Sequence, residues 1–111
     1  MQMVTSILCD LDGVLIEHES DYKPLPGAVQ ATKQWQKNGM LLVILTARKC
    51  VDKDRLNVLF GPIHAVVCGI GSGQRVLIND KKPWLPGVDM AISVNTKRNA
   101  CFETNDFKRT S

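Results

Sequence analysis

Hydrophobic and polar residues along the chain follow two alternating periods, one typical of strands and one of helices. Short apolar runs predict buried strands at residues 3–9, 40–45 and 63–68. Between them, residues 26–38 and 51–60 carry apolar side chains at helical spacing. Strands and helices that alternate in this way predict an α/β fold with a mostly parallel sheet.

Two further strands are predicted at residues 76–78 and 90–94, followed by a short helix or an irregular tail. Only residues 69–75 connect the first of these to the preceding strand, whereas a parallel crossover takes about a dozen residues or more. Very short strands, an uncovered loop or an antiparallel pair would each explain this connection. The sequence leaves the strand order there open.

Composition is that of an ordinary globular domain. With 111 residues, 44% hydrophobic and 23% charged, we expect a single domain over residues 1–111. No apolar run approaches the roughly 20 residues of a membrane helix, and no signal peptide is recognisable, so we expect a cytoplasmic protein without membrane contact. The four cysteines lack zinc-finger spacing and are expected to be reduced thiols.

Charge is distributed unevenly along the chain. Residues 1–22 hold five acids and no lysine or arginine, while residues 23–111 hold six acids against fourteen bases, a net +8. An acidic pocket in basic surroundings suits a bound cation and an anionic substrate. A basic surface without a partner explains the charge equally well, and the pair Lys97-Arg98 is interpreted as part of a solvated tail.

Two carboxylates follow the first predicted strand, in the stretch Asp10-Leu11-Asp12-Gly13. Side chains two residues apart on an extended chain point to the same side, and α/β sheets bind ligands at the carboxyl ends of their strands. Carboxylates so close together favour a cation between them, or one of them protonated. The first case gives a magnesium site, and the second a nucleophile with a general acid. The alternative is a solvated turn, which the apolar strand in front disfavours.

Polar residues also follow two other predicted strands. Thr46 and Arg48 come after the second strand, where a hydroxyl and a guanidinium suit a phosphoryl group. A Thr46 that caps the next helix explains that residue equally well. Asp80 follows the strand at 76–78 and offers a metal another carboxylate, although Asn79-Asp80 before two lysines also fits a turn.

Taken in order, these segments resemble the haloacid dehalogenase superfamily of phosphohydrolases. Residues 6–15 are similar to its first motif, residues 45–48 to its second and residues 77–80 to its fourth. The resemblance spans residues 3–95. It implies a single Rossmann-like domain with helices on both faces of the sheet, a central first strand and a site at the carboxyl edge.

The resemblance also implies a magnesium-dependent phosphatase that works through an aspartyl-phosphate intermediate. Asp10 would attack phosphorus, and Asp12 would protonate the leaving oxygen and then activate water. Magnesium would be held by the side chains of Asp10 and Asp80 and by the carbonyl of Asp12. Such chemistry depends mainly on positioning and charge neutralisation. The residues that bind the phosphorylated substrate would be Thr46, Ala47 and Arg48.

One family motif is missing. The third is a lysine or arginine shortly before the fourth, and it neutralises the nucleophile and the phosphate; residues 68–74 contain neither. Arg75, Lys81 and Lys82 are the candidate replacements. Arg75 opens the strand before Asp80, roughly 13 Å from that strand's carboxyl end, whereas the lysines adjoin Asp80. We therefore expect a lysine to matter more than Arg75.

The segments 13–25 and 47–63 are too short for the cap domain that many members carry, so the chain resembles a capless member. The expected substrates are a sugar phosphate, a nucleotide or a nucleic-acid end, and residues 13–24 are expected to act as a mobile flap. The sequence leaves a homo-oligomer open.

Three other functions fit less well. A dehalogenase would need the nucleophile alone, which leaves Asp12 and Asp80 unexplained. A phosphate- or metal-binding module that acts through partners is favoured by the missing third motif. A nucleic-acid-binding protein would need a basic stripe interleaved with aromatic residues, and the sequence has none.

Overall fold

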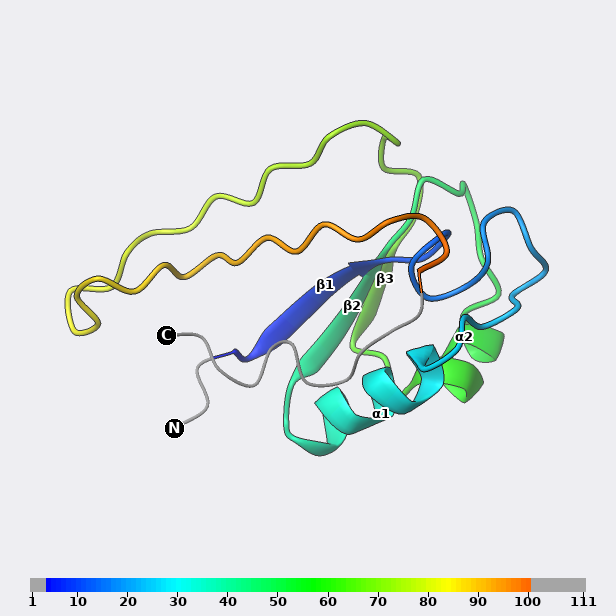
Figure 1. Cartoon of the computed structure of the whole chain (residues 1–111), viewed down its shortest axis with the longest axis horizontal. Coiled ribbons are helices and arrows are strands. Elements are labelled where there is room, and N and C mark those ends of the chain that lie inside the picture. The colour runs from blue at the N-terminus through cyan, green and yellow to red at the C-terminus, as the bar shows by residue number, and fades with distance from the viewer. Residues whose placement is uncertain (1–3, 101–111) are drawn as a thin grey trace.

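Three parallel strands alternate with two helices in the computed structural model, which describes residues 4–100 (Figure 1). In chain order the elements are β1 (Ser6–Asp10), α1 (Ala28–Lys37), β2 (Leu41–Leu45), α2 (Lys53–Phe60) and β3 (Ala65–Val67). The sheet order is β1-β2-β3, and both strand pairs are parallel. The predicted α/β fold with a parallel sheet is confirmed.

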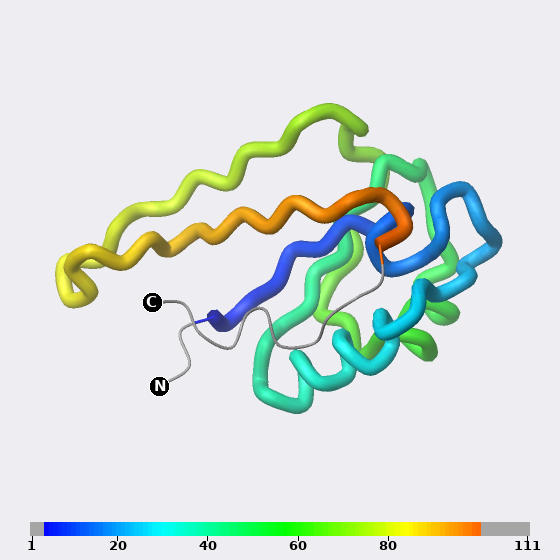
Figure 2. The backbone as a smooth tube through the Cα atoms, viewed as in Figure 1, coloured from blue at the N-terminus to red at the C-terminus, as the bar shows by residue number. Residues whose placement is uncertain are grey.

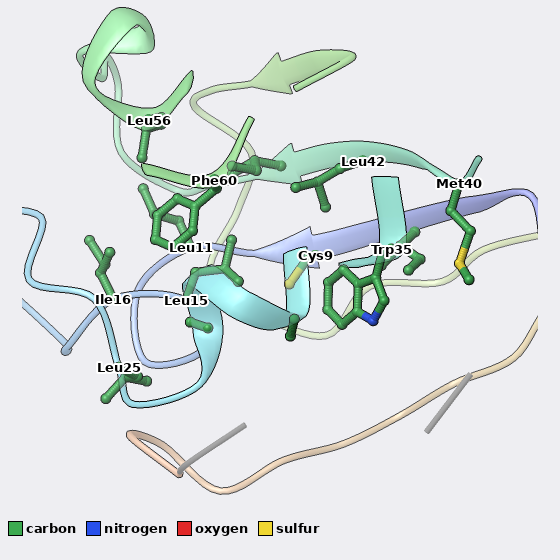
Figure 3. Close-up of a cluster of buried hydrophobic side chains, with 14 residues drawn as sticks. Cys9, Leu11, Leu15, Ile16, Leu25, Trp35, Met40, Leu42, Leu56 and Phe60 are labelled. Carbon is green, nitrogen blue, oxygen red and sulfur yellow. The ribbon is translucent and has the colours of Figure 1, made fainter. Parts of the chain in front are cut away.

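Strand periodicity decides which face of the sheet carries the core. Ile7 and Cys9 of β1 lie in register with Leu42 and Ile44 of β2, and all four are buried. They pack against both helices, through Trp35 of α1 among others (Figure 3). Burial raises the pKa of the Cys9 thiol to about 12, with a smaller contribution from the neighbouring Asp10 charge.

Both helices therefore cover the same face of the sheet (Figure 1). The resemblance implies helices on both faces, but no helix among residues 4–100 covers the second face. Leu8, Leu41 and Val67 on that face stay nearly half exposed. Within the described part of the chain, no helix is long and apolar enough to cross a membrane.

The loop after β1 is anchored, in contrast to the predicted mobile flap. Leu15 and Ile16 are fully buried, and the backbone N–H groups of both donate to the carbonyl of Leu11. Further along, the backbone N–H of Leu25 donates to the carbonyl of Leu15 at 2.9 Å. Apolar side chains within this mostly polar segment thus fix the chain that carries Asp12 to the core.

The start of α2 supports the same loop. Asp52 caps the helix by accepting a hydrogen bond from the backbone N–H of Arg55, so Thr46 is not the cap. Tyr22 accepts a hydrogen bond from the backbone N–H of Asp52 at 2.9 Å. The guanidinium of Arg55 lies over the Tyr22 ring and pairs with Asp21 at 3.1 Å.

After β3 the chain leaves the sheet as an extended arm, residues 70–96. Figure 2 shows it running out from the sheet and returning. The predicted strands at 76–78 and 90–94 are not formed, so β1 lies at an edge of the described sheet and not at its centre. The connection 69–75 is shorter than a parallel crossover that would pass β2 and reach the free edge of β1. Large apolar side chains on the arm consequently remain exposed: Val76, Leu77, Ile78, Trp84, Ile92 and Val94.

Candidate functional site

The carboxyl ends of β1 and β2 meet at one edge of the sheet. Asp10 is the last residue of β1 and is paired in register with Leu45, the last residue of β2. A cleft of about 650 Å³ opens beside this edge, and Asp10, Asp12 and Ala47 line it. Parallel pairing thus brings two of the predicted motifs to one place, where α/β sheets bind ligands.

The Asp12 carboxylate forms a bidentate ion pair with Arg48. Nε of Arg48 donates to one Asp12 oxygen at 2.8 Å, and Nη2 donates to the other at 2.6 Å. Nη2 also donates to the carbonyl of Ser20 at 3.1 Å. The hydrogen bond to Asp12 raises the pKa of Arg48 above its ordinary value. Arg48 therefore joins the loop after β1 to the end of β2 through a bidentate ion pair.

Asp10 faces a second arginine, from the beginning of the arm. Nη1 of Arg75 lies 3.6 Å from Oδ1 of Asp10, and Nη2 donates to the carbonyl of Gly71 at 3.0 Å. The sequence predicted that Arg75 opens a strand and lies far from its carboxyl end. Residues 74–78 form no strand, so this separation does not arise. Among residues 4–100, Arg75 is thus the cation that pairs with Asp10.

Thr46 is placed differently from the prediction. Its side chain is buried, and its Oγ1 accepts a hydrogen bond from the backbone N–H of Arg48 at 3.1 Å. Its backbone N–H donates to the carbonyl of Val67 at 2.9 Å. In this arrangement Thr46 shapes the turn after β2 and does not line the cleft, whereas Ala47 and Arg48 do.

The fourth motif lies away from the cleft. Asp80 is exposed on the arm and pairs with Lys82, whose hydrogen bond lowers the pKa of the Asp80 carboxyl. Lys81 pairs with Asp89 at 3.5 Å near the tip of the arm. None of Asp80, Lys81 and Lys82 lines the cleft, because the segment before them does not pair with β1.

The magnesium site implied by the resemblance is not assembled in this arrangement. Among residues 4–100, no group of three or more His, Cys, Asp or Glu side chains could hold a metal ion. Asp10 is paired with Arg75, Asp12 with Arg48 and Asp80 with Lys82. The carboxylates present do not fit a shared cation here.

Arg98 also lines the cleft, and the sequence analysis missed this residue. A basic pair near the end of the sequence is typical of a solvated surface, and no local pattern connects it with Asp10. The hydrogen bonds of the next residue, Asn99, place it there. The backbone N–H of Asn99 donates to the carbonyl of Gly13 at 2.8 Å, and its Oδ1 accepts from the backbone N–H of His18 at 2.8 Å.

Comparison with known proteins gives one partial likeness. A solved structure of a phosphatase of the haloalkanoate (HAD) enzyme superfamily from Bacteroides thetaiotaomicron is 27% identical to this chain, with a TM-score of 0.49. The match covers 60% of this chain and 24% of the other. No family model and no curated protein matches the sequence. The chain spans about a quarter of the length of that phosphatase.

Proposed function

We propose that the chain is a phosphatase of the haloacid dehalogenase type, which hydrolyses phosphomonoesters through an aspartyl-phosphate. The observation that carries the proposal is the placement of Asp10 and Asp12 in one cleft with the guanidinium groups of Arg48 and Arg75. Carboxylates supply a nucleophile and a proton carrier, and arginines suit phosphoryl oxygens. The motif resemblance at residues 6–15 and 45–48 supports the same assignment.

In the first step, an Asp10 oxygen attacks phosphorus and the bond from phosphorus to the ester oxygen breaks. Protonated Asp12 gives its proton to the leaving alcohol. In the second step, Asp12 takes a proton from water, the water oxygen attacks phosphorus, and the bond to Asp10 breaks to release phosphate. Arg75 neutralises charge beside the nucleophile throughout.

Asp12 can carry this proton only when Arg48 releases it. Both Asp12 oxygens accept hydrogen bonds from Arg48 in the free protein, so the oxygen that would carry the proton is occupied. An incoming phosphoryl group competes for the same guanidinium, since it offers the same bidentate geometry. Substrate binding would thus free Asp12 for proton transfer.

A binding module that acts through partners is the second candidate. The observations in its favour are the engagement of both Asp12 oxygens and the absence of a metal-binding group within residues 4–100. Such a module would bind phosphate in the cleft and release none.

The experiment is a panel of phosphomonoesters assayed for phosphate release with and without magnesium. The panel covers sugar phosphates, nucleotides and DNA 3′-phosphate ends, so the rates also show which of these substrate classes the protein prefers. The oligomeric state of the same protein sample is measured. Catalysed release from any substrate supports the phosphatase. Phosphate binding without release from any substrate would favour the module.

Magnesium carries no step of this proposal and stays a prediction from the sequence. With Asp80 on the arm, we expect Asp80→Ala to leave the affinity for magnesium unchanged in a calorimetric titration, with Asp89→Ala as the matched control. A selective loss of affinity in Asp80→Ala would show that the arm brings Asp80 to Asp10, as the resemblance implies.

A further inference from the structure

Among the described residues, one arginine that lines the cleft has no counterion. Arg48 is paired with Asp12 and Arg75 with Asp10. The third carboxylate that lines the cleft, Glu19, is exposed and lies 3.5 Å from Nε2 of His18. The side chain of Arg98 lines the same cleft and forms no hydrogen bond or ion pair with any residue in the range 4–100. A cation left unmatched in a concave site favours an anionic ligand.

Arg98 is held in this place by its neighbours. Asn99 adopts a left-handed backbone conformation, with φ 60°, and forms two hydrogen bonds with the loop after β1, through Gly13 and His18. These bonds link segments more than 80 residues apart in sequence. These bonds fix the chain directly after the arm, so the position of Arg98 is set by the same loop that carries Asp12.

The glycine at position 13 admits the Arg98 stem. A Cβ added to Gly13 would lie 3.1 Å from Cγ of Arg98, tighter than ordinary van der Waals contact, and its φ of +80° is itself unfavourable for other residues. The aliphatic part of Arg98 thus lies directly over the turn after Asp12, at the cleft that Arg98 lines.

We propose that Arg98 binds a second anionic group of the substrate, so that the preferred substrates are phosphomonoesters that also carry a carboxylate or a second phosphate. The inference rests on the proposed function and names its substrate class. Arg75 serves the phosphoryl group at Asp10, which leaves Arg98 for a different group. A guanidinium binds carboxylate and phosphate alike through two parallel hydrogen bonds.

The test uses non-hydrolysable phosphonates, so that binding is measured whether or not the protein releases phosphate. The matched probes are 2-hydroxy-4-phosphonobutanoate, which carries a carboxylate, and 3,4-dihydroxybutylphosphonate, in which a hydroxymethyl group replaces it. Butane-1,4-diylbisphosphonate supplies a second phosphonate. Affinities are measured by calorimetry for the unmodified protein, Arg98→Ala and Lys97→Ala. Lys97 is exposed, is adjacent in sequence and does not line the cleft.

We expect the unmodified protein to bind at least one of the two probes that carry a second anionic group about tenfold more tightly than the hydroxymethyl probe. This difference is that expected of a charged hydrogen bond. Arg98→Ala should remove this preference and leave affinity for the hydroxymethyl probe within about twofold, and Lys97→Ala should retain it. Of the carboxylate probe and the bisphosphonate, the one that binds more tightly identifies the second group as carboxylate or phosphate. Circular dichroism checks that each variant is folded.

Three results would overturn the inference: no preference in the unmodified protein, an equal loss for all probes in Arg98→Ala, or no binding of any probe. The proposed function fails separately. If the probes bind with the expected preference but the corresponding phosphate esters are not hydrolysed, Arg98 keeps its role and the phosphatase is rejected.

Discussion

Replacing Asp10 with asparagine is expected to lower phosphate release by at least about a thousandfold while the protein stays folded. An amide is a far poorer nucleophile than a carboxylate, and no aspartyl-phosphate can form on it. The stability cost should be small, because the ion pair between Asp10 and Arg75 is partly exposed and 3.6 Å long. The measurement is phosphate release from an aryl phosphate, with circular dichroism for the fold.

The matched control is Asp89→Asn, the same change of acid to amide on the arm, where Asp89 pairs with the exposed Lys81. This variant should retain full activity. Undiminished turnover by folded Asp10→Asn protein would remove Asp10 from the mechanism and with it the aspartyl-phosphate.

Replacing Arg75 with alanine is expected to lower kcat/KM by about a hundredfold, whereas Lys81→Ala and Lys82→Ala stay within about twofold of the unmodified protein. Charge that develops on the transferring phosphoryl group beside Asp10 needs a fixed cation, and Arg75 is the described residue paired with that carboxylate. The lysines pair instead with Asp89 and Asp80. This order reverses the expectation from sequence.

The two lysine variants serve as matched controls, because each removes one positive charge from the same segment of the chain. Arg75→Lys should recover part of the lost activity, since it restores the charge without the planar fork. An active Arg75→Ala together with an inactive Lys81→Ala or Lys82→Ala would restore the order expected from sequence, and would place the arm near Asp10 during turnover.

The helices and strands of residues 6–67 could be predicted from the sequence, because the spacing of apolar residues in each element shows which side of it is buried. The apolar run at 40–45 became β2, and the stripe that contains Trp35 became the buried face of α1. Parallel pairing then necessarily placed Asp10 and the turn at Thr46 at one edge of the sheet. Periodicity and the rules for parallel strands are local or nearly local, so a sequence alone carries them.

The structure of the arm could not be predicted from local sequence patterns. The apolar residues at 76–78 have the composition of a strand, yet a strand exists only where a neighbour supplies hydrogen bonds, and none forms for this segment within the described chain. Asp80, Lys81 and Lys82 depend on that pairing for their position. Their place in the sequence therefore did not determine their distance from Asp10.

The sequence by itself determined the α/β order of the elements and the sheet edge that carries Asp10 and Asp12. Only the tertiary structure decided the partners of these carboxylates, Arg48 and Arg75, and brought Arg98 into the same cleft. Flexible side chains and contacts between distant segments, such as the bond from His18 to Asn99 over 81 positions, leave no periodic signal. They form because the folded chain satisfies many weak interactions at once, and that balance is a property of the whole structure.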